Sequence, residues 1–129
     1  MYKITINDYN IEVECADTFK KRLFGLMGKK EFSGLLFKQK YSNRFCSSIH
    51  TSFMRVPIDL IYINKNMRIT QTTTIKPWKI FIPKDDNTKY ILELPENSIK
   101  NNDIKVNNTI KIKKKYKKVI KKFFEQIIF

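Results

Sequence analysis

Short apolar segments, each broken after a few residues by Asn, Asp, Pro or Gly, run from residue 2 to residue 112 of this chain. Segments of this length with alternating or β-branched apolar residues are typical of strands, and their close spacing favours tight turns between them. We therefore expect a mainly β fold, a small barrel or sandwich of short antiparallel strands. The predicted strands cover residues 2–7, 11–15, 35–37, 46–54, 57–63, 67–74, 79–82, 90–94 and 104–112.

Three segments depart from this β pattern. Residues 17–25 carry apolar side chains at helical spacing and predict one short helix after the first hairpin, ended by Gly25 or Gly28. A single helical turn is expected at residues 97–102. From Lys113 onward the apolar residues follow helical spacing while lysines fill the other face, which predicts a C-terminal amphipathic helix. The chain thus divides into one mainly β domain over residues 1–112 and a basic helical tail over residues 113–129.

The net charge of +14 comes mainly from lysine, which supplies 22 of the 26 basic residues against four arginines. Seven lysines less Glu125 give the tail +6 and leave +8 on the remainder. Proteins that recognise a base sequence rely on the planar guanidinium group of arginine, which can form two hydrogen bonds with one base. Because this chain has few arginines, we expect no sequence-specific nucleic-acid binding. The stretch Lys113–Lys122 leaves three alternatives open: packing on the domain, contact with an anionic membrane surface or a partner's groove, and weak polyanion contact.

The two cysteines, Cys15 and Cys46, are too few for a disulfide framework, and we expect reduced thiols, with a single bridge as the alternative. The first residues alternate and include Asp8, unlike the apolar core of a secretory signal. No run approaches the ~20 apolar residues of a membrane-spanning helix. We expect a cytoplasmic protein, with peripheral membrane attachment as a further option.

Chemistry-bearing residues concentrate between positions 46 and 64. His50 is the one histidine, and histidine is the side chain best suited to proton transfer near neutral pH. In a strand over 46–54, His50 and Met54 would share an accessible polar row, whereas Thr51 and Phe53 would point the other way.

Two acids interrupt apolar strands. Asp59 is expected to pair with Arg22 or Arg55, or to accept hydrogen bonds from backbone amides near Pro57, because an unpartnered buried carboxylate is costly. Glu93 repeats the pattern, and either acid with His50 would make an acid–base pair. Trp78 is either a lid over the core or a stacking platform for a sugar or a base.

No motif names a cofactor. Cys46 and His50 would be two metal ligands, but no further spaced cysteine or histidine completes a site, so we predict no metal. The three glycines match no nucleotide-binding fingerprint, and no nucleophile elbow is present. We therefore predict no cofactor, name no catalytic residue and lean against an enzyme.

Five pieces of the sequence, in this order and spacing, resemble the family called domain of unknown function 192. They are Ala16-x-Thr18 with Arg22 and Gly25-Leu-Met27, Gly34-Leu-Leu-Phe37, the run from Cys46 to Asp59, Lys76-Pro-Trp78, and Leu92-Glu-Leu-Pro95. The resemblance covers residues 8–112 and implies a compact, mainly β domain with a short helix after the first hairpin. The family carries no assigned activity, so the resemblance implies a site region and no reaction. The positions that match its motif are Arg22, His50, Thr51, Met54, Asp59, Trp78 and Glu93.

This chain departs from the family pattern at two turn positions. Asn97 and Asn102 stand where the family usually has glycine, and asparagine tolerates the left-handed conformation best after glycine, so the turns should survive.

Three functions stay open. The leading hypothesis is a module that binds a small molecule or a protein, with a polar site around His50, Arg55, Asp59 and Trp78. The alternative is a hydrolase- or isomerase-like enzyme that uses His50 with Asp59 or Glu93 as acid and base. The third is an accessory protein that associates with a membrane surface or a polyanion through its tail.

Overall fold

The computed structural model describes residues 1–15 and 34–114, and these ranges form a mainly β fold with one short helix. The strands and helix within them are β1 (Tyr2–Ile6), β2 (Tyr9–Cys15), β3 (Leu35–Lys38), β4 (Ile49–His50), β5 (Ile58–Asn64), β6 (Ile69–Ile75), β7 (Ile80–Phe81), β8 (Thr88–Pro95), α2 (Ser98–Asn101) and β9 (Ile110–Lys114). The predicted helix over 17–25 and the tail from residue 115 lie outside the described residues.

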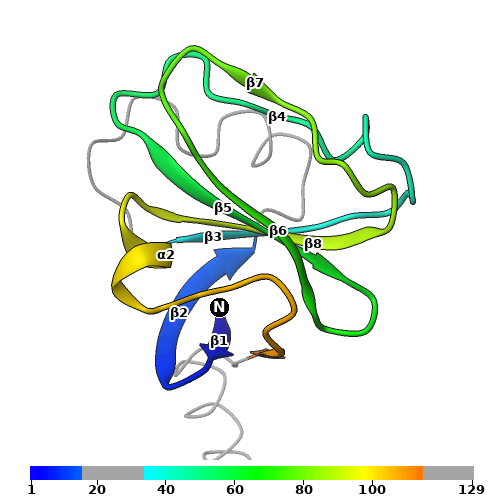
Figure 1. Ribbon diagram of the computed structural model, residues 1–129, viewed down its shortest axis with the longest axis vertical. Coiled ribbons are helices and arrows are strands. Elements are labelled where there is room, and N and C mark those ends of the chain that lie inside the picture. Colours follow the sequence, from blue (N-terminus) through cyan, green and yellow to red (C-terminus); the bar gives the residue numbers. More distant parts are fainter. Residues whose placement is uncertain (16–33, 115–129) are drawn as a thin grey trace, which may run out of the picture.

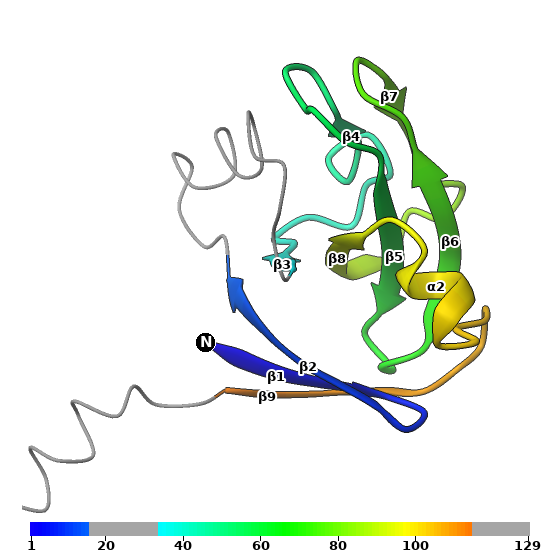
Figure 2. The ribbon, with the colours of Figure 1, turned by 90° about the vertical axis from the view of Figure 1, so that its left-hand side faces the viewer.

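Seven strands form one sheet in the order β6-β5-β8-β3-β2-β1-β9, and the sheet curls into a half-barrel (Figures 1 and 2). Its two outermost strands approach each other at one end. There, an isolated bridge joins Arg68 to Thr109, and the Ile110 N–H donates to the Met67 carbonyl at 2.9 Å. The barrel alternative of the sequence analysis is therefore closer to the structure than the sandwich.

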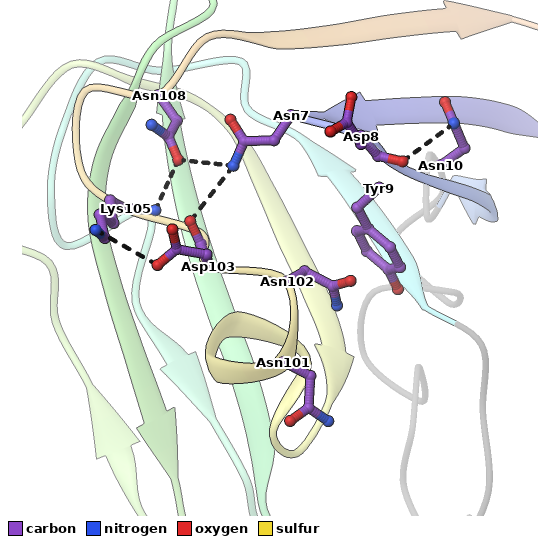
Figure 3. A pocket seen from close by; sticks show the side chains of 9 residues that line it. All are labelled: Asn7, Asp8, Tyr9, Asn10, Asn101, Asn102, Asp103, Lys105 and Asn108. Atoms are coloured by element: carbon purple, nitrogen blue, oxygen red, sulfur yellow. Dashed lines mark hydrogen bonds and ion pairs between the residues drawn. The ribbon is translucent and has the colours of Figure 1, made fainter.

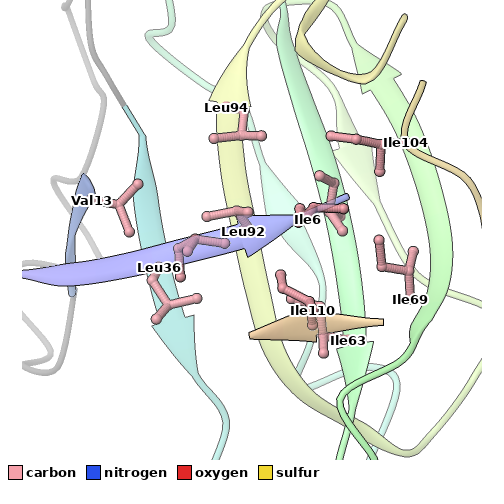
Figure 4. Packing of buried hydrophobic residues seen from close by; sticks show 11 residues of the cluster. Ile6, Val13, Leu36, Ile63, Ile69, Leu92, Leu94, Ile104 and Ile110 are labelled. Atoms are coloured by element: carbon pink, nitrogen blue, oxygen red, sulfur yellow. The ribbon is translucent and has the colours of Figure 1, made fainter. Parts of the chain in front are cut away.

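The concave side of the curled sheet holds an apolar core (Figure 4). It draws side chains from all seven strands of the sheet and from the loop after α2: Ile4, Ile6, Val13, Leu36, Ile61, Ile63, Ile69, Leu92, Leu94, Ile104 and Ile110. Each buried side chain of this size contributes about 1.5–3 kcal/mol relative to exposure, so this cluster is a large source of stability.

A second apolar cluster covers the opposite face of the sheet. It contains Leu35, Phe37, Met54, Ile58, Leu60, Tyr62, Ile75 and Ile91, with Ile49 and Phe81 packed against it. Strand β5 is consequently buried on both faces, which explains its nearly continuous run of apolar residues. The segments around β4 and β7 form the layer that covers this second cluster (Figure 2).

Several predicted elements are confirmed. The first hairpin turns at Asn7-Asp8, and Asn7 takes a left-handed φ of 54°. Helix α2 provides the helical turn expected after β8. Gly34 precedes β3 at a point where an added Cβ would lie 2.6 Å from Val13 Cγ1, so a larger residue would collide with the core.

Three expectations about the strands were wrong. The strand predicted over 46–54 is reduced to β4, because successive turns bend the chain on both sides of it. The strand predicted over 104–112 begins only at Ile110, and it continues through Lys113 and Lys114, which we had placed in the tail helix. Strands β2 and β3 pair in parallel rather than antiparallel.

Both turns expected at Asn97 and Asn102 are present, but the left-handed residue is shifted in the second one. Asn97 has the expected left-handed φ of 74°, but Asn102 has a φ of −112°. The left-handed position lies one residue later, at Asp103, whose φ is 50°.

Candidate functional site

Thr51 joins two loops at the end of the molecule that carries β4 and β7. Its hydroxyl donates to the Lys76 carbonyl at 2.7 Å and accepts from the Lys79 N–H at 2.8 Å. Its backbone carbonyl accepts from Trp78 N–H at 2.9 Å and from Met54 N–H at 3.1 Å. Thr51 is fully buried, so these bonds fix the 51–54 turn against the 76–79 turn.

Each of these turns presents one large aromatic side chain to solvent. Phe53 is 58% exposed and Trp78 is 62% exposed, and their ring centroids lie 4.7 Å apart. Both residues have left-handed backbones, with φ values of 64° and 62°. Bulky residues rarely adopt this conformation, which costs about 1–2 kcal/mol for a residue that has a Cβ.

Strands β4 and β7 set the orientation of the neighbouring side chains. Ile49 pairs with Phe81, and both pack inward on the second apolar cluster. His50 pairs with Ile80 on the outer face, where Ile80 is 74% exposed. His50 is exposed as expected, and it shares the outward side with an apolar neighbour rather than with a polar row.

Asp59 is a structural residue on the other face of the sheet. Its carboxylate accepts hydrogen bonds from the Thr74 hydroxyl at 2.7 Å and from the Ile99 N–H at 2.9 Å. These bonds tie β5 to β6 and to the first turn of α2. The expected backbone-amide partner therefore exists, but it belongs to α2 rather than to the kink at Pro57.

Glu93 lies on the face of the second cluster, opposite the face of Asp59. It pairs with Leu60 on one side and with Leu35 on the other. Burial raises the pKa of Glu93 to about 8. Burial also raises the pKa of Tyr62, with a smaller contribution from Glu93, and the Tyr62 hydroxyl donates to the Ser47 carbonyl at 3.1 Å.

The structure thus separates the predicted site residues into distinct groups. Thr51 and Met54 are buried and hold the loops in place, and Arg55 is exposed on the segment that follows Phe53. Asp59 and Glu93 do not share a face with each other. Arg22 lies outside the described residues. Phe53 and Ile80 were not predicted as site residues. In a strand over 46–54 the side chain of Phe53 would point away from His50, and no local sequence signal marks the turn that exposes it.

A hollow lies away from these residues, between the β1–β2 turn and the loop that connects α2 to β9 (Figure 3). It has a volume of about 900 Å³, is open to solvent, and is lined mainly by asparagines: Asn7, Asp8, Tyr9, Asn10, Asn101, Asn102, Asp103, Lys105 and Asn108. The Asn7 side chain donates to Asn108 Oδ1 at 3.3 Å, and Lys105 forms an ion pair with Asp103 at 3.4 Å. The Asn7 contact connects the β1–β2 turn to the loop before β9, whereas the ion pair lies within that loop.

Within residues 1–15 and 34–114, no group of three or more His, Cys, Asp or Glu side chains could hold a metal ion. Cys15 and Cys46 are thiols and do not form a disulfide. No helix of the described part of the chain is long and apolar enough to cross a membrane.

Two solved bacterial structures share this architecture. A Sinorhizobium meliloti protein, described provisionally as a transcription regulator, superposes with a TM-score of 0.71 at 17% identity, covering 85% of this chain and 90% of that one. A protein of unknown function from Novosphingobium aromaticivorans gives 0.70 at 16% identity, covering 85% and 82%. At these identities the likeness shows the fold alone. The fold defines a class of small, mainly β domains built on a curled half-barrel sheet.

Sequence comparison identifies the family within that class. The model of domain of unknown function 192 (DUF192), described as an uncharacterized ACR, matches residues 2–112. A UPF0127 protein of Pyrococcus horikoshii is 45% identical over 84 residues, which are 65% of this chain and 72% of the relative. Another from Pyrococcus furiosus is 37% identical over 103 residues, covering 80% and 88%. The chain belongs to the DUF192 family, and the resemblance seen in the sequence is confirmed.

Proposed function

We propose that this chain is a ligand- or partner-binding module and that it binds through the exposed Phe53–Trp78 pair. The observation that carries the proposal is the backbone conformation of these two residues. Both have bulky, solvent-exposed side chains and yet adopt a left-handed backbone conformation. Strained conformations persist where the surrounding structure enforces them, and they cluster at functional positions. Here Thr51 enforces them by fixing both turns.

The proposed surface keeps three of the four residues of the polar site predicted from the sequence. His50, Arg55 and Trp78 are exposed on the two segments that Thr51 joins. Asp59 is left out of the proposed surface, because its carboxylate already accepts hydrogen bonds from Thr74 and Ile99, and Phe53 is included instead. The ligand would therefore meet aromatic faces with polar groups around them, an arrangement that suits a molecule with a flat ring.

The acid–base alternative receives less support from the geometry. A general base must lie within hydrogen-bond reach of the proton that it removes. Asp59 and Glu93 lie on opposite faces of the sheet, so they cannot serve one substrate together. His50 points to the outer side of β4, away from the cluster that surrounds Glu93.

Trp78 makes the binding proposal directly testable, because it is the one tryptophan of the chain. A ligand that stacks on Trp78 will change its fluorescence. We would titrate the full chain with a panel of sugars, nucleotides, inorganic phosphate and divalent metals, and follow the melting temperature in parallel. A ligand at a hundredfold excess over Kd stabilises the folded state by about 2.7 kcal/mol.

Matched variants separate a site from a general solvent effect. Phe53→Asn removes half of the aromatic pair, and His50→Ala removes the neighbouring imidazole. Val106→Asn is the control, because Val106 is an exposed apolar residue in the loop before β9. Binding that Phe53→Asn weakens and Val106→Asn preserves supports the proposal. A ligand that stabilises the protein equally in all variants, without a response of Trp78, rejects it.

A further inference from the structure

Exposed apolar side chains are concentrated in two segments of the chain, those that contain and flank β4 and β7. Among the described residues, eight large hydrophobic side chains are exposed, and six of them lie between residues 41 and 53 or between 78 and 82: Tyr41, Phe45, Phe53, Trp78, Ile80 and Ile82. These six include every exposed aromatic residue in that group. Figure 1 shows β4 and β7 side by side, with residues 51–54 and 76–79 at one end of this pair and residues 41–46 toward its other end, where Arg44 contacts Asp86. Among the six side chains, Phe53 and Trp78 are in contact, and contiguous exposed apolar side chains mark an interaction surface.

The same two segments carry positive charge without negative charge. Residues 41–56 and 76–84 contain five basic residues and no Asp or Glu: Arg44, Arg55, Lys76, Lys79 and Lys84. All five side chains belong to exposed residues. Negative charge borders these segments at one end, where Asp85 accepts a hydrogen bond from the Asn87 N–H at 2.7 Å and Asp86 accepts one from the Arg44 N–H at 2.9 Å. We call the exposed residues of 41–56 and 76–84 the basic aromatic surface.

Cations and rings alternate closely on the basic aromatic surface. Trp78 stands between Lys76 and Lys79 in the sequence, and Arg55 follows Phe53 by two residues. At the other aromatic position, the Arg44 guanidinium lies 4.8 Å from the centroid of the Phe45 ring. Protein–protein interfaces are depleted in lysine, so this composition does not suit a protein partner. Aromatic rings with cations around them are what single-stranded nucleic acids bind, because bases stack on the rings and phosphates approach the cations.

We infer that the basic aromatic surface binds an unpaired strand of nucleic acid, without base-sequence preference, with bases stacked on Phe53 and Trp78. This inference rests on the proposed function, since both use the same aromatic pair. The bases of a duplex are already stacked on one another, so they are not available to stack on the rings of Phe53 and Trp78. Lysine supplies three of the five cations, which fits contact with phosphates rather than bidentate reading of bases.

The test is fluorescence anisotropy of a labelled oligothymidylate of about 20 nucleotides, longer than the roughly 4–16 nucleotides that comparable surfaces cover. The full chain is titrated against this strand and against a duplex of the same length. We expect tighter binding to the single strand. Trp78→Ala and Phe53→Ala should each weaken it by about 5- to 100-fold, the range measured for loss of one stacked base.

The charge contribution is tested by salt titration. A triple variant with Arg55, Lys76 and Lys79 changed to Gln should reduce the slope of log K against log salt by about 2, because each phosphate contact to a single strand contributes roughly 0.7. The control triple variant changes Lys65, Lys100 and Lys111, which are exposed elsewhere, to Gln. It removes the same charge and should leave the slope nearly unchanged.

Three outcomes overturn the inference. One is equal affinity for strand and duplex, unaffected by either aromatic variant. Another is an equal slope change in both triple variants, which would show general polyanion attraction. The third is binding that the aromatic variants retain and removal of residues 115–129 abolishes. If no oligonucleotide binds while another compound changes Trp78 fluorescence, the inference fails and the binding-module proposal stands.

Discussion

Thr51 and Lys79 bind each other reciprocally: the Thr51 N–H donates to the Lys79 carbonyl at 2.8 Å, and the Lys79 N–H donates to the Thr51 hydroxyl at 2.8 Å. Residues 28 positions apart in the chain are thereby held in one fixed relation. The aromatic pair depends on this relation, because Phe53 and Trp78 stand in the two turns that it joins.

Replacing Thr51 with Val should destabilise the protein by about 1–3 kcal/mol. The substitution keeps the shape and leaves the Lys79 N–H and the Lys76 carbonyl without the hydroxyl that now serves them. Thr51→Ser keeps the hydroxyl and is the matched control. Urea unfolding measures both, and equal stability of Val and Ser variants would contradict the assigned role.

Exchanging Phe53 for Asn should change the free energy of unfolding by less than about 1 kcal/mol. Asparagine accepts the left-handed backbone, and this gain offsets the lost contact with Trp78, for which aromatic pairs contribute about 0.5–1.5 kcal/mol. We expect ligand binding to be lost even though the fold is intact. A large loss of stability would mean that Phe53 serves the core and not a ligand.

Asp59→Ala should destabilise the protein by about 1.5–3 kcal/mol, since it removes two charge-assisted hydrogen bonds from a buried position. Thr74→Val removes one of the two and should cost less. Because Asp59 lies away from the proposed surface, the folded variant should bind ligand as the wild type does. If a folded Asp59 variant lost ligand binding, Asp59 would have to be part of the binding site.

The buried Glu93 predicts that stability falls as the pH rises. Its pKa is about 8 in the folded protein, above the ordinary value of 4.5 for a glutamate, so the folded state holds a proton that the unfolded state releases. The stabilising contribution is complete below the unfolded pKa and is lost progressively up to about pH 8, at up to roughly 1.4 kcal/mol per pH unit. Glu93→Gln should flatten this dependence in urea unfolding between pH 5 and 8. Parallel curves for the two proteins would contradict it.

The tail gives the last prediction. Deletion of residues 115–129 removes five lysines and Glu125, a net charge of +4. If the apolar stripe packs on the domain, as we expect, the melting temperature and solubility will fall with the deletion. Unchanged stability, together with salt-sensitive binding to anionic liposomes that vanishes on deletion, would support the interfacial alternative instead.

Much of the sheet follows from local sequence patterns. The alternation of residues 2–15 specifies the first hairpin, and the apolar run of β5 specifies a strand buried on both faces. The segment 46–54 misled the same reasoning. Its alternation suits a strand, but local turn bonds such as Cys46 N–H to the Asn43 carbonyl, and the contacts of Thr51 with a distant loop, determine its path.

The candidate site was only partly predictable for the same reason. The accessibility of His50 and Trp78 could be expected from their neighbours in the sequence. The exposure of Phe53 could not, because it depends on a left-handed turn fixed by Lys76 and Lys79. The two acids also looked alike in sequence, and only the pairing of β5 with β8 places them on opposite faces.

The pairing of the first strand with the last has a consequence for how the chain acquires its fold. Strand β1 lies between β2 and β9, and Tyr2 is paired with Lys114. During synthesis β1 can pair with β2 early, but its other edge stays open until β9 has left the ribosome. Contacts between such distant residues slow folding, since the intervening chain must first be closed into a loop. A nascent chain that ends before β9 therefore exposes an unpaired strand edge, the kind of surface that recruits other chains into aggregates.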